Sequence, residues 1–250
     1  MIKNNLKAGI FDSGVGGLSV VKSLLSEHQF SEIIYYGDTA RVPYGTKDKN
    51  TIIRYSLEAL EFFKNFDIDI LITACNTVSA YAIDELRKQA PFEVIGVIEP
   101  GVIALQNKLK DKNATILITG TNATIKSGKY KRLLNDKGYN NILELATGLF
   151  VPLVEERIYS GKIMDAAMEH YFSKITKPDA LIMGCTHFPL ISSEYKKFFK
   201  DTILLHSGDA IVEYLKNNFD FNAKYEKTNI KYFATENPEH LKNIAKEWLK

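Results

Sequence analysis

The chain has 250 residues, which is enough for one large or two modest domains. Apolar residues make up 45% of it and charged residues 25%, as is ordinary for a soluble globular enzyme. The net charge is only +2, so the composition gives no reason to expect a nucleic acid or a membrane as a partner.

The first part of the chain alternates between short apolar runs, which predict strands, and longer segments with an apolar stripe, which predict helices. A glycine turn at residues 13–17 joins the first strand to its helix. The helix after the second strand carries Ile53, Leu57 and Leu60 on one face. The strands predicted in this part are residues 8–12, 33–36, 68–73 and 94–98.

The pattern then restarts, with predicted strands at residues 115–119, 142–145 and 181–183. The tail ends in a helix that Asn237 can cap and in which Pro238 fits the first position. Strands that alternate with helices predict an α/β fold, with parallel sheets covered on both faces.

The two cysteines of the chain lie in similar local sequences 110 positions apart. Residues 69–77 (DILITACNT) and 179–187 (DALIMGCTH) each contain an Asp, a short apolar run, a small residue and then the cysteine. Cys75 and Cys185 are therefore expected just past the carboxyl ends of two buried parallel strands, where open α/β sheets bind their ligands. Two similar thiols in similar settings indicate chemistry that acts from two sides.

Simpler roles exist for these cysteines, since either one alone could be a small buried hydrophobic residue. A disulfide is disfavoured, because residues 1–7 lack the apolar stretch of a signal peptide and no run approaches the ~18 apolar residues of a membrane helix. We therefore expect a cytoplasmic protein with free thiols. No metal site is predicted, because the chain has no CxxC or HxxxH and two distant cysteines supply too few ligands.

A second pair of landmarks indicates an internal duplication. Asp12 at the end of the first strand and Thr119 at its counterpart lie 107 positions apart, close to the 110 that separate the cysteines. These offsets predict two similar parallel-sheet α/β domains, with pseudo-twofold symmetry and the active site in the cleft between them. We expect the tail to return to the first half. The first domain would then comprise residues 1–97 plus 209–250, and the second residues 98–208.

The glycine turn at residues 13–17 could hold an anion at a helix N-terminus. It lacks the spacing of GxGxxG, and no GxxxxGK[ST] occurs, so a carboxylate is a better candidate than a nucleotide phosphate. Polar residues also follow the other predicted strands. Together they predict a small polar pocket that excludes water.

Six segments resemble the motifs of bacterial glutamate racemases, in the aspartate/glutamate racemase family, and occur in the same order over most of the chain. They are residues 11–18 (FDSGVGGL), 36–38 (YGD), 43–45 (PYG), 74–77 (ACNT), 150–155 (FVPLVE) and 184–189 (GCTHFP). The resemblance implies interconversion of L- and D-glutamate without a cofactor and supply of D-glutamate for peptidoglycan. It also implies a homodimer of paired α/β domains, with glutamate as the small-molecule partner.

The resemblance further implies roles for individual residues. Cys75 and Cys185 would be the acid/base pair, with Asp12 as proton partner of the first thiol, His187 as partner of the second, and Glu155 near the second. The implied substrate-binding residues are Asp12, Ser13, Pro43, Tyr44, Gly45, Asn76, Thr77, Thr119, Thr121, Thr186 and His187.

Racemisation of an amino acid favours an enzyme with two acid/base groups. Inverting a Cα centre means removing its proton from one face and returning one to the other, and a single group does not easily reach both faces. The alternatives are an aspartate racemase, a non-catalytic amino-acid-binding protein and a thiol redox enzyme. The chain departs from the usual family pattern at Thr147-Gly148 and at His206-Ser207, where Cys-Pro and Asp-Ser are common.

Overall fold

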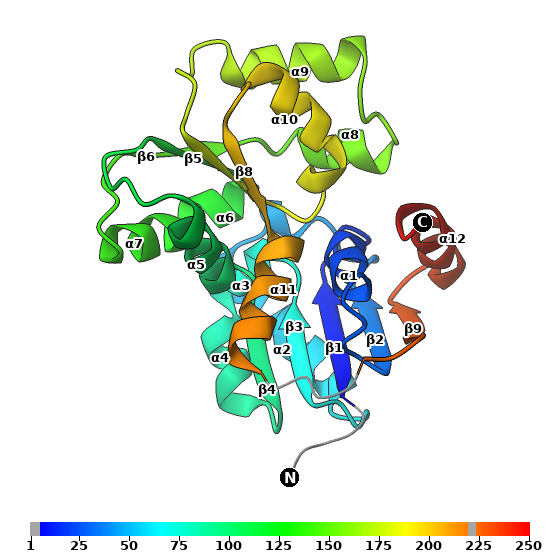
Figure 1. The fold of residues 1–250 in the computed structure, drawn as a ribbon. Helices are drawn as coiled ribbons and strands as arrows, with labels where there is room; N and C mark the ends of the chain where they lie inside the picture. The colour runs from blue at the N-terminus through cyan, green and yellow to red at the C-terminus, as the bar shows by residue number, and fades with distance from the viewer. Residues whose placement is uncertain (1–5, 220–223) are drawn as a thin grey trace.

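The computed structural model describes residues 6–219 and 224–250, which form two lobes, each built on a parallel β-sheet (Figure 1). The sheet of the first lobe has the strand order β4-β3-β1-β2-β9. Its strands are β1 (Lys7–Asp12), β2 (Glu32–Gly37), β3 (Ile70–Thr73), β4 (Glu93–Gly96) and β9 (Asn229–Ala234). The central strands β1 and β3 are almost wholly buried, as continuous apolar runs in a covered parallel sheet require.

The sheet of the second lobe has the order β6-β5-β7-β8. Its strands are β5 (Ile116–Gly120), β6 (Ile142–Ala146), β7 (Ala180–Gly184) and β8 (Ile203–His206). When β5 to β8 are matched in turn with β1 to β4, every strand has the same neighbours in both sheets, and β9 is an addition to the first. The fold is thus two similar parallel-sheet α/β domains, as the sequence predicts.

The strand register brings the two cysteines to equivalent places. In the first sheet Thr73, the last residue of β3, pairs with Phe11 of β1. In the second sheet Gly184, the last residue of β7, pairs with Gly120 of β5. Cys185 follows Gly184 directly, and Cys75 follows Thr73 after Ala74. Both cysteines therefore lie at the carboxyl edge where ligands bind in parallel sheets.

Helices cover both sheets and begin where the sequence supplies caps. In the first lobe Asp48 accepts a hydrogen bond from the backbone N–H of Thr51 and so caps α2. In the second lobe Thr121 caps α6 in the same way through Thr124. The helices of the first lobe are α1 (Leu18–Leu25), α2 (Lys49–Phe63), α3 (Asn76–Tyr81) and α4 (Ile83–Gln89), with the short helix η1 (Tyr44–Thr46). Those of the second are α6 (Asn122–Ser127), α7 (Lys129–Asp136), α8 (Phe150–Glu155), α9 (Lys162–Phe172) and α10 (Ser192–Phe198), with η2 (Phe188–Ile191).

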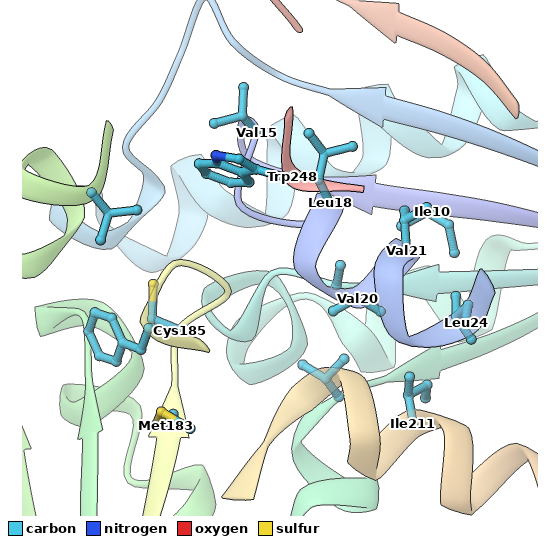
Figure 2. Close-up of a cluster of buried hydrophobic side chains, with 14 of the residues drawn as sticks. Ile10, Val15, Leu18, Val20, Val21, Leu24, Met183, Cys185, Ile211 and Trp248 are labelled. Carbon is cyan, nitrogen blue, oxygen red and sulfur yellow. The ribbon is translucent and has the colours of Figure 1, made fainter. Parts of the chain in front are cut away.

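Two further helices connect the lobes. Helix α5 (Ile98–Lys108) follows the last of the first four strands but packs on β7, β8 and α7 of the second lobe. Helix α11 (Ser207–Asn218) follows β8 and packs on α5 and on α1 of the first lobe. Figure 2 shows Val20 and Leu24 of α1 directed toward Ile211 of α11, and all three belong to one apolar core shared by both lobes. The domain boundaries given by the sequence remain a prediction.

The tail returns to the first lobe. Strand β9 pairs in parallel with β2, and α12 (Pro238–Trp248) packs on β9 and α1. Asn237 caps α12, and the Trp248 indole donates a hydrogen bond to the Tyr159 hydroxyl, 3.1 Å away, in the second lobe. Among the residues that the structure describes, no helix has the length and apolar character needed to span a membrane.

The structure also differs from the sequence prediction in places. The fourth strand ends at Gly96, because Ile98 already begins α5. The third begins at Ile70, two positions later than predicted. Strands β8 and β9 are absent from the prediction, and β9 is what completes the first sheet.

Candidate active site

A small cavity, with a volume of about 20 Å³, lies between the lobes and contains both cysteines. Its wall is formed by Ser13, Val42, Pro43, Tyr44, Gly45, Cys75, Asn76, Thr77, Thr121, Val151, Gly184, Cys185, Thr186 and His187. A larger and more open hollow, lined partly by Lys22, Tyr159 and Trp248, contains neither cysteine. We therefore take the smaller cavity as the candidate active site.

The groups near the Cys75 sulfur are the Ser13 hydroxyl and the Asp12 carboxylate. It is 6% exposed and precedes the first residue of α3. Its thiol donates a hydrogen bond to the Ser13 hydroxyl, with Sγ and Oγ 3.6 Å apart. Burial, and next the negative charge of Asp12, raise the pKa of Cys75 to about 12. At neutral pH this group is therefore a protonated thiol.

Cys185 lies beside an imidazole instead. Its Sγ is 3.6 Å from Nδ1 of His187, whose Nε2 is 3.1 Å from Oε1 of Glu155. Burial disfavours the imidazolium, but the hydrogen bonds to Cys185 and Glu155 outweigh it and raise the pKa of His187 to about 10. A cation thus faces the second sulfur at neutral pH. Figure 2 shows Cys185 in the loop that follows β7.

Asp12 is fully buried and connects the glycine turn of the first lobe with the second lobe. One carboxylate oxygen accepts the backbone N–H of Gly14 at 3.0 Å, and the other accepts the Thr186 hydroxyl at 3.4 Å. Burial raises the pKa of Asp12, and the charge of His187 opposes that rise. The Asp12 side chain therefore interacts electrostatically with Cys75 and with His187, which lies beside Cys185.

The loop that contains Pro43, Tyr44 and Gly45 is held by a buried carboxylate. The Tyr44 hydroxyl donates a hydrogen bond to Asp38, which also accepts from Arg41 at 2.7 Å. Burial and the bond to Asp38 raise the pKa of Tyr44, which keeps its hydroxyl protonated.

Gly45 brings the two lobes into close contact. A Cβ at this position would lie only 2.4 Å from Cβ of Thr121, so the approach of the lobes requires glycine here. Hydroxyl groups join the lobes beside it, since Oγ1 of Thr77 lies 3.0 Å from Oγ1 of both Thr121 and Thr124.

Most of the residues predicted from the sequence lie on the cavity wall; Asp12, Glu155 and Thr119 do not. Asp12 and Glu155 contact wall residues, Thr186 and His187. Thr119 is buried and does not line the cavity, and its hydroxyl lies 3.2 Å from that of Tyr195. The wall also contains Val42, Val151 and Gly184, which were not predicted from the sequence as site residues. Val151 and Gly184 lie within two of the six motif segments.

The departures from the family pattern lie off the wall. Thr147 is fully buried after β6, and Nε2 of His206 lies 2.9 Å from Oδ2 of Asp209. Among the residues that the structure describes, no three His, Cys, Asp or Glu side chains are grouped so as to hold a metal ion.

The structure thus places two thiols on the wall of one cavity between two similar α/β lobes. The sequence model of the Asp/Glu/Hydantoin racemase family matches residues 16–215, and the chain belongs to this family.

Individual relatives are similar over nearly the full length. The glutamate racemase of Nitratiruptor sp. is 62% identical over 246 residues, covering 98% of this chain and 97% of the relative. The crystal structure of glutamate racemase from Campylobacter jejuni superposes with a TM-score of 0.96 at 58% identity, covering 98% of each chain. Glutamate racemase from Francisella tularensis in complex with D-glutamate has a TM-score of 0.86 at 33% identity, covering 99% of this chain and 94% of that one.

Proposed function

We propose that this protein interconverts L- and D-glutamate without a cofactor, with Cys75 and Cys185 as its two acid/base groups. The observation that carries the proposal is the presence of both thiols on the wall of one cavity, at equivalent strand ends of the two lobes. The similarity to glutamate racemases, one of them in complex with D-glutamate, supports glutamate as the substrate.

The proposed reaction moves one proton at each face of Cα. With L-glutamate bound, the Cys185 thiolate, paired with the His187 imidazolium, takes the Cα proton and becomes a thiol. The electron pair left on Cα then takes a proton from the Cys75 thiol on the opposite face, which leaves Cys75 as the thiolate. D-Glutamate reacts by the reverse sequence, so the charge alternates between the two sulfurs.

The enclosed site supports this chemistry physically. Removing a Cα proton is difficult, and fixed dipoles in a cavity with little water stabilise the developing negative charge better than mobile solvent does. The hydroxyls of Ser13, Thr77, Thr121 and Thr186 would bind the substrate carboxylates. Asp12 would accept a hydrogen bond from the substrate ammonium, and Glu155 would hold His187 in its orientation.

We further propose that the enzyme works in the cytoplasm as a homodimer and supplies D-glutamate for peptidoglycan. The domains would be residues 1–97 plus 209–250 and residues 98–208. Helices α5 and α11, which begin at Ile98 and Ser207 and cross between the lobes, support this division.

Incubation of the purified protein with L-glutamate in D₂O tests the proposal. We expect the optical rotation to decay to zero and the Cα proton to be replaced by deuterium at a matching rate. Binding without either change would indicate an amino-acid-binding protein. Equal turnover of aspartate would contradict the substrate assignment, and loss of activity on anaerobic reduction of the thiols would indicate redox chemistry.

A further inference from the structure

The side chain of Asn76, the residue after Cys75, is held at both ends by groups outside the first sheet. Its Oδ1 accepts a hydrogen bond from the Tyr130 hydroxyl at 2.7 Å, and its Nδ2 donates one to the Ser207 hydroxyl at 3.1 Å. All three residues are at most 4% exposed. The orientation of this cavity-lining amide is therefore fixed from the second lobe and from the crossing helix α11.

Tyr130 also contacts the segment that carries the other cysteine. It lies on α7, and a Cβ at Gly184 would be 3.3 Å from its ring, tighter than an ordinary van der Waals contact. Gly184 is the residue before Cys185 and part of the cavity wall. A Cβ at Gly101 of α5 would lie 3.5 Å from the ring and hydroxyl of Tyr130. The ring is thus seated against two glycines, and its hydroxyl reaches Asn76.

One side chain therefore touches the residue that follows the first thiol and the residue that precedes the second. We infer that Tyr130 is a positioning residue that fixes the two thiol-bearing loops relative to each other, an inference that rests on the proposed two-base racemisation. Burial raises the pKa of the Tyr130 hydroxyl, so it remains a proton donor to Asn76 at neutral pH.

Loss of this positioning by Tyr130 should impair inversion of the Cα centre more than removal of its proton. Removal of the Cα proton requires one thiol in reach, whereas inversion requires the second thiol in reach on the opposite face at the same time. If the two loops are held less firmly relative to each other, delivery of a proton from the far thiol should slow. The first thiol then has more time to exchange its proton with solvent and to return a solvent-derived hydron to the same face of Cα. Displacements of the order of 1 Å cost roughly a hundredfold in such reactions.

The test compares Tyr130→Phe with Tyr139→Phe, which removes another buried hydroxyl of the second lobe, one that donates to the Leu109 carbonyl. For Tyr130→Phe with L-glutamate in D₂O, we expect kcat for racemisation to fall roughly tenfold to a hundredfold, with KM changed less than about threefold. We also expect a rise in the share of Cα deuterium found in L-glutamate, meaning exchange without inversion. Tyr139→Phe should keep the wild-type values of both quantities.

Racemisation by the wild-type protein tests the proposed function separately, and only the ratios between variants and wild type test the role of Tyr130. Equal losses in the two Tyr→Phe variants, or an unchanged share of exchange without inversion, would overturn the inference. Circular dichroism checks that each variant is folded. Should Tyr130→Phe fail to fold, Ser207→Ala removes the other restraint on Asn76, and it must show the same shift toward exchange without inversion or the inference is wrong.

Discussion

Cys75 and Cys185 occupy equivalent positions in two similar lobes, yet their surroundings differ. Cys75 has a hydroxyl as its hydrogen-bond partner and the charge of Asp12 nearby, and both burial and that charge favour the neutral thiol. Cys185 has His187 at 3.6 Å, with Glu155 behind the imidazole. Of these two loops, only the second places a cation beside its sulfur.

The difference shows that two similar lobes can place two cysteines in chemically different surroundings. Identical strand order and register set the two sulfurs at the same edge of each sheet. The side chains around each loop then give the two sulfurs different surroundings. Cys75 is held as a protonated thiol, whereas Cys185 faces an imidazole that is cationic at neutral pH.

The largest expected effect comes from removing either sulfur. Cys75→Ser and Cys185→Ser each keep the approximate size but remove an accessible conjugate base, so racemisation should fall by roughly a thousandfold or more. Because the enantiomers have equal free energies, kcat/KM must fall by the same factor in both directions. The asymmetry is instead measured with a glutamate analogue that carries a leaving group at Cβ, since its elimination needs a single deprotonation.

In that elimination assay Cys75→Ser should retain more activity on the L-isomer, and Cys185→Ser more on the D-isomer. Equal losses on both isomers in both variants would contradict the assignment of faces. Full racemisation by either variant would contradict the two-base mechanism itself.

The next largest effect should follow from removing the cation beside Cys185. His187→Asn leaves the second thiol without its imidazolium, and elimination from the L-analogue should fall about a hundredfold, as for loss of a general acid/base partner. Elimination from the D-analogue, which uses Cys75, should change far less. A uniform loss on both isomers would mean that His187 serves the whole cavity instead of one thiol.

A chemical probe should distinguish the thiols directly. The thiolate is the form that reacts with iodoacetamide, and the pKa of Cys75 is raised to about 12. At pH 8 we expect Cys185 to be alkylated at least about tenfold faster than Cys75, as followed by peptide mass spectrometry. Both residues are 6% exposed, so access alone does not favour one of them. Faster labelling of Cys75 would contradict the expectation that Cys185 is the more reactive thiol.

The smallest expected effect is on stability. Because the pKa of His187 is raised from 6.5 to about 10, its stabilising interactions are complete below pH 6.5 and are lost as the pH rises toward 10. The free energy of unfolding of the wild type minus that of His187→Asn should therefore fall between pH 6.5 and 9.0, by at most about 1.4 kcal/mol per pH unit. Urea unfolding measures it, and an unchanged or rising difference would argue against a charged His187.

The local sequence was sufficient to predict a feature when the residues that determine it lie within one segment of the chain. The cysteine loops follow buried apolar strands, and the cap Asn237 lies beside its helix. It was insufficient for β8 and β9, which are partly exposed strands at the edges of their sheets. The contact between Tyr130 and Asn76 had no local signal, because it depends on how separate segments pack.

The position of β9 has a consequence for how the chain is made. Residues 229–234 pair with β2, which the ribosome releases almost two hundred residues earlier. While the whole second lobe is being synthesised, the nascent first sheet therefore exposes an unpaired edge strand, the kind of edge that invites pairing with other chains. The second lobe, whose four strands are contiguous in the sequence, has its complete sheet available first. Shielding of the β2 edge until the last residues emerge would then be a requirement for high yields of this protein in a heterologous host.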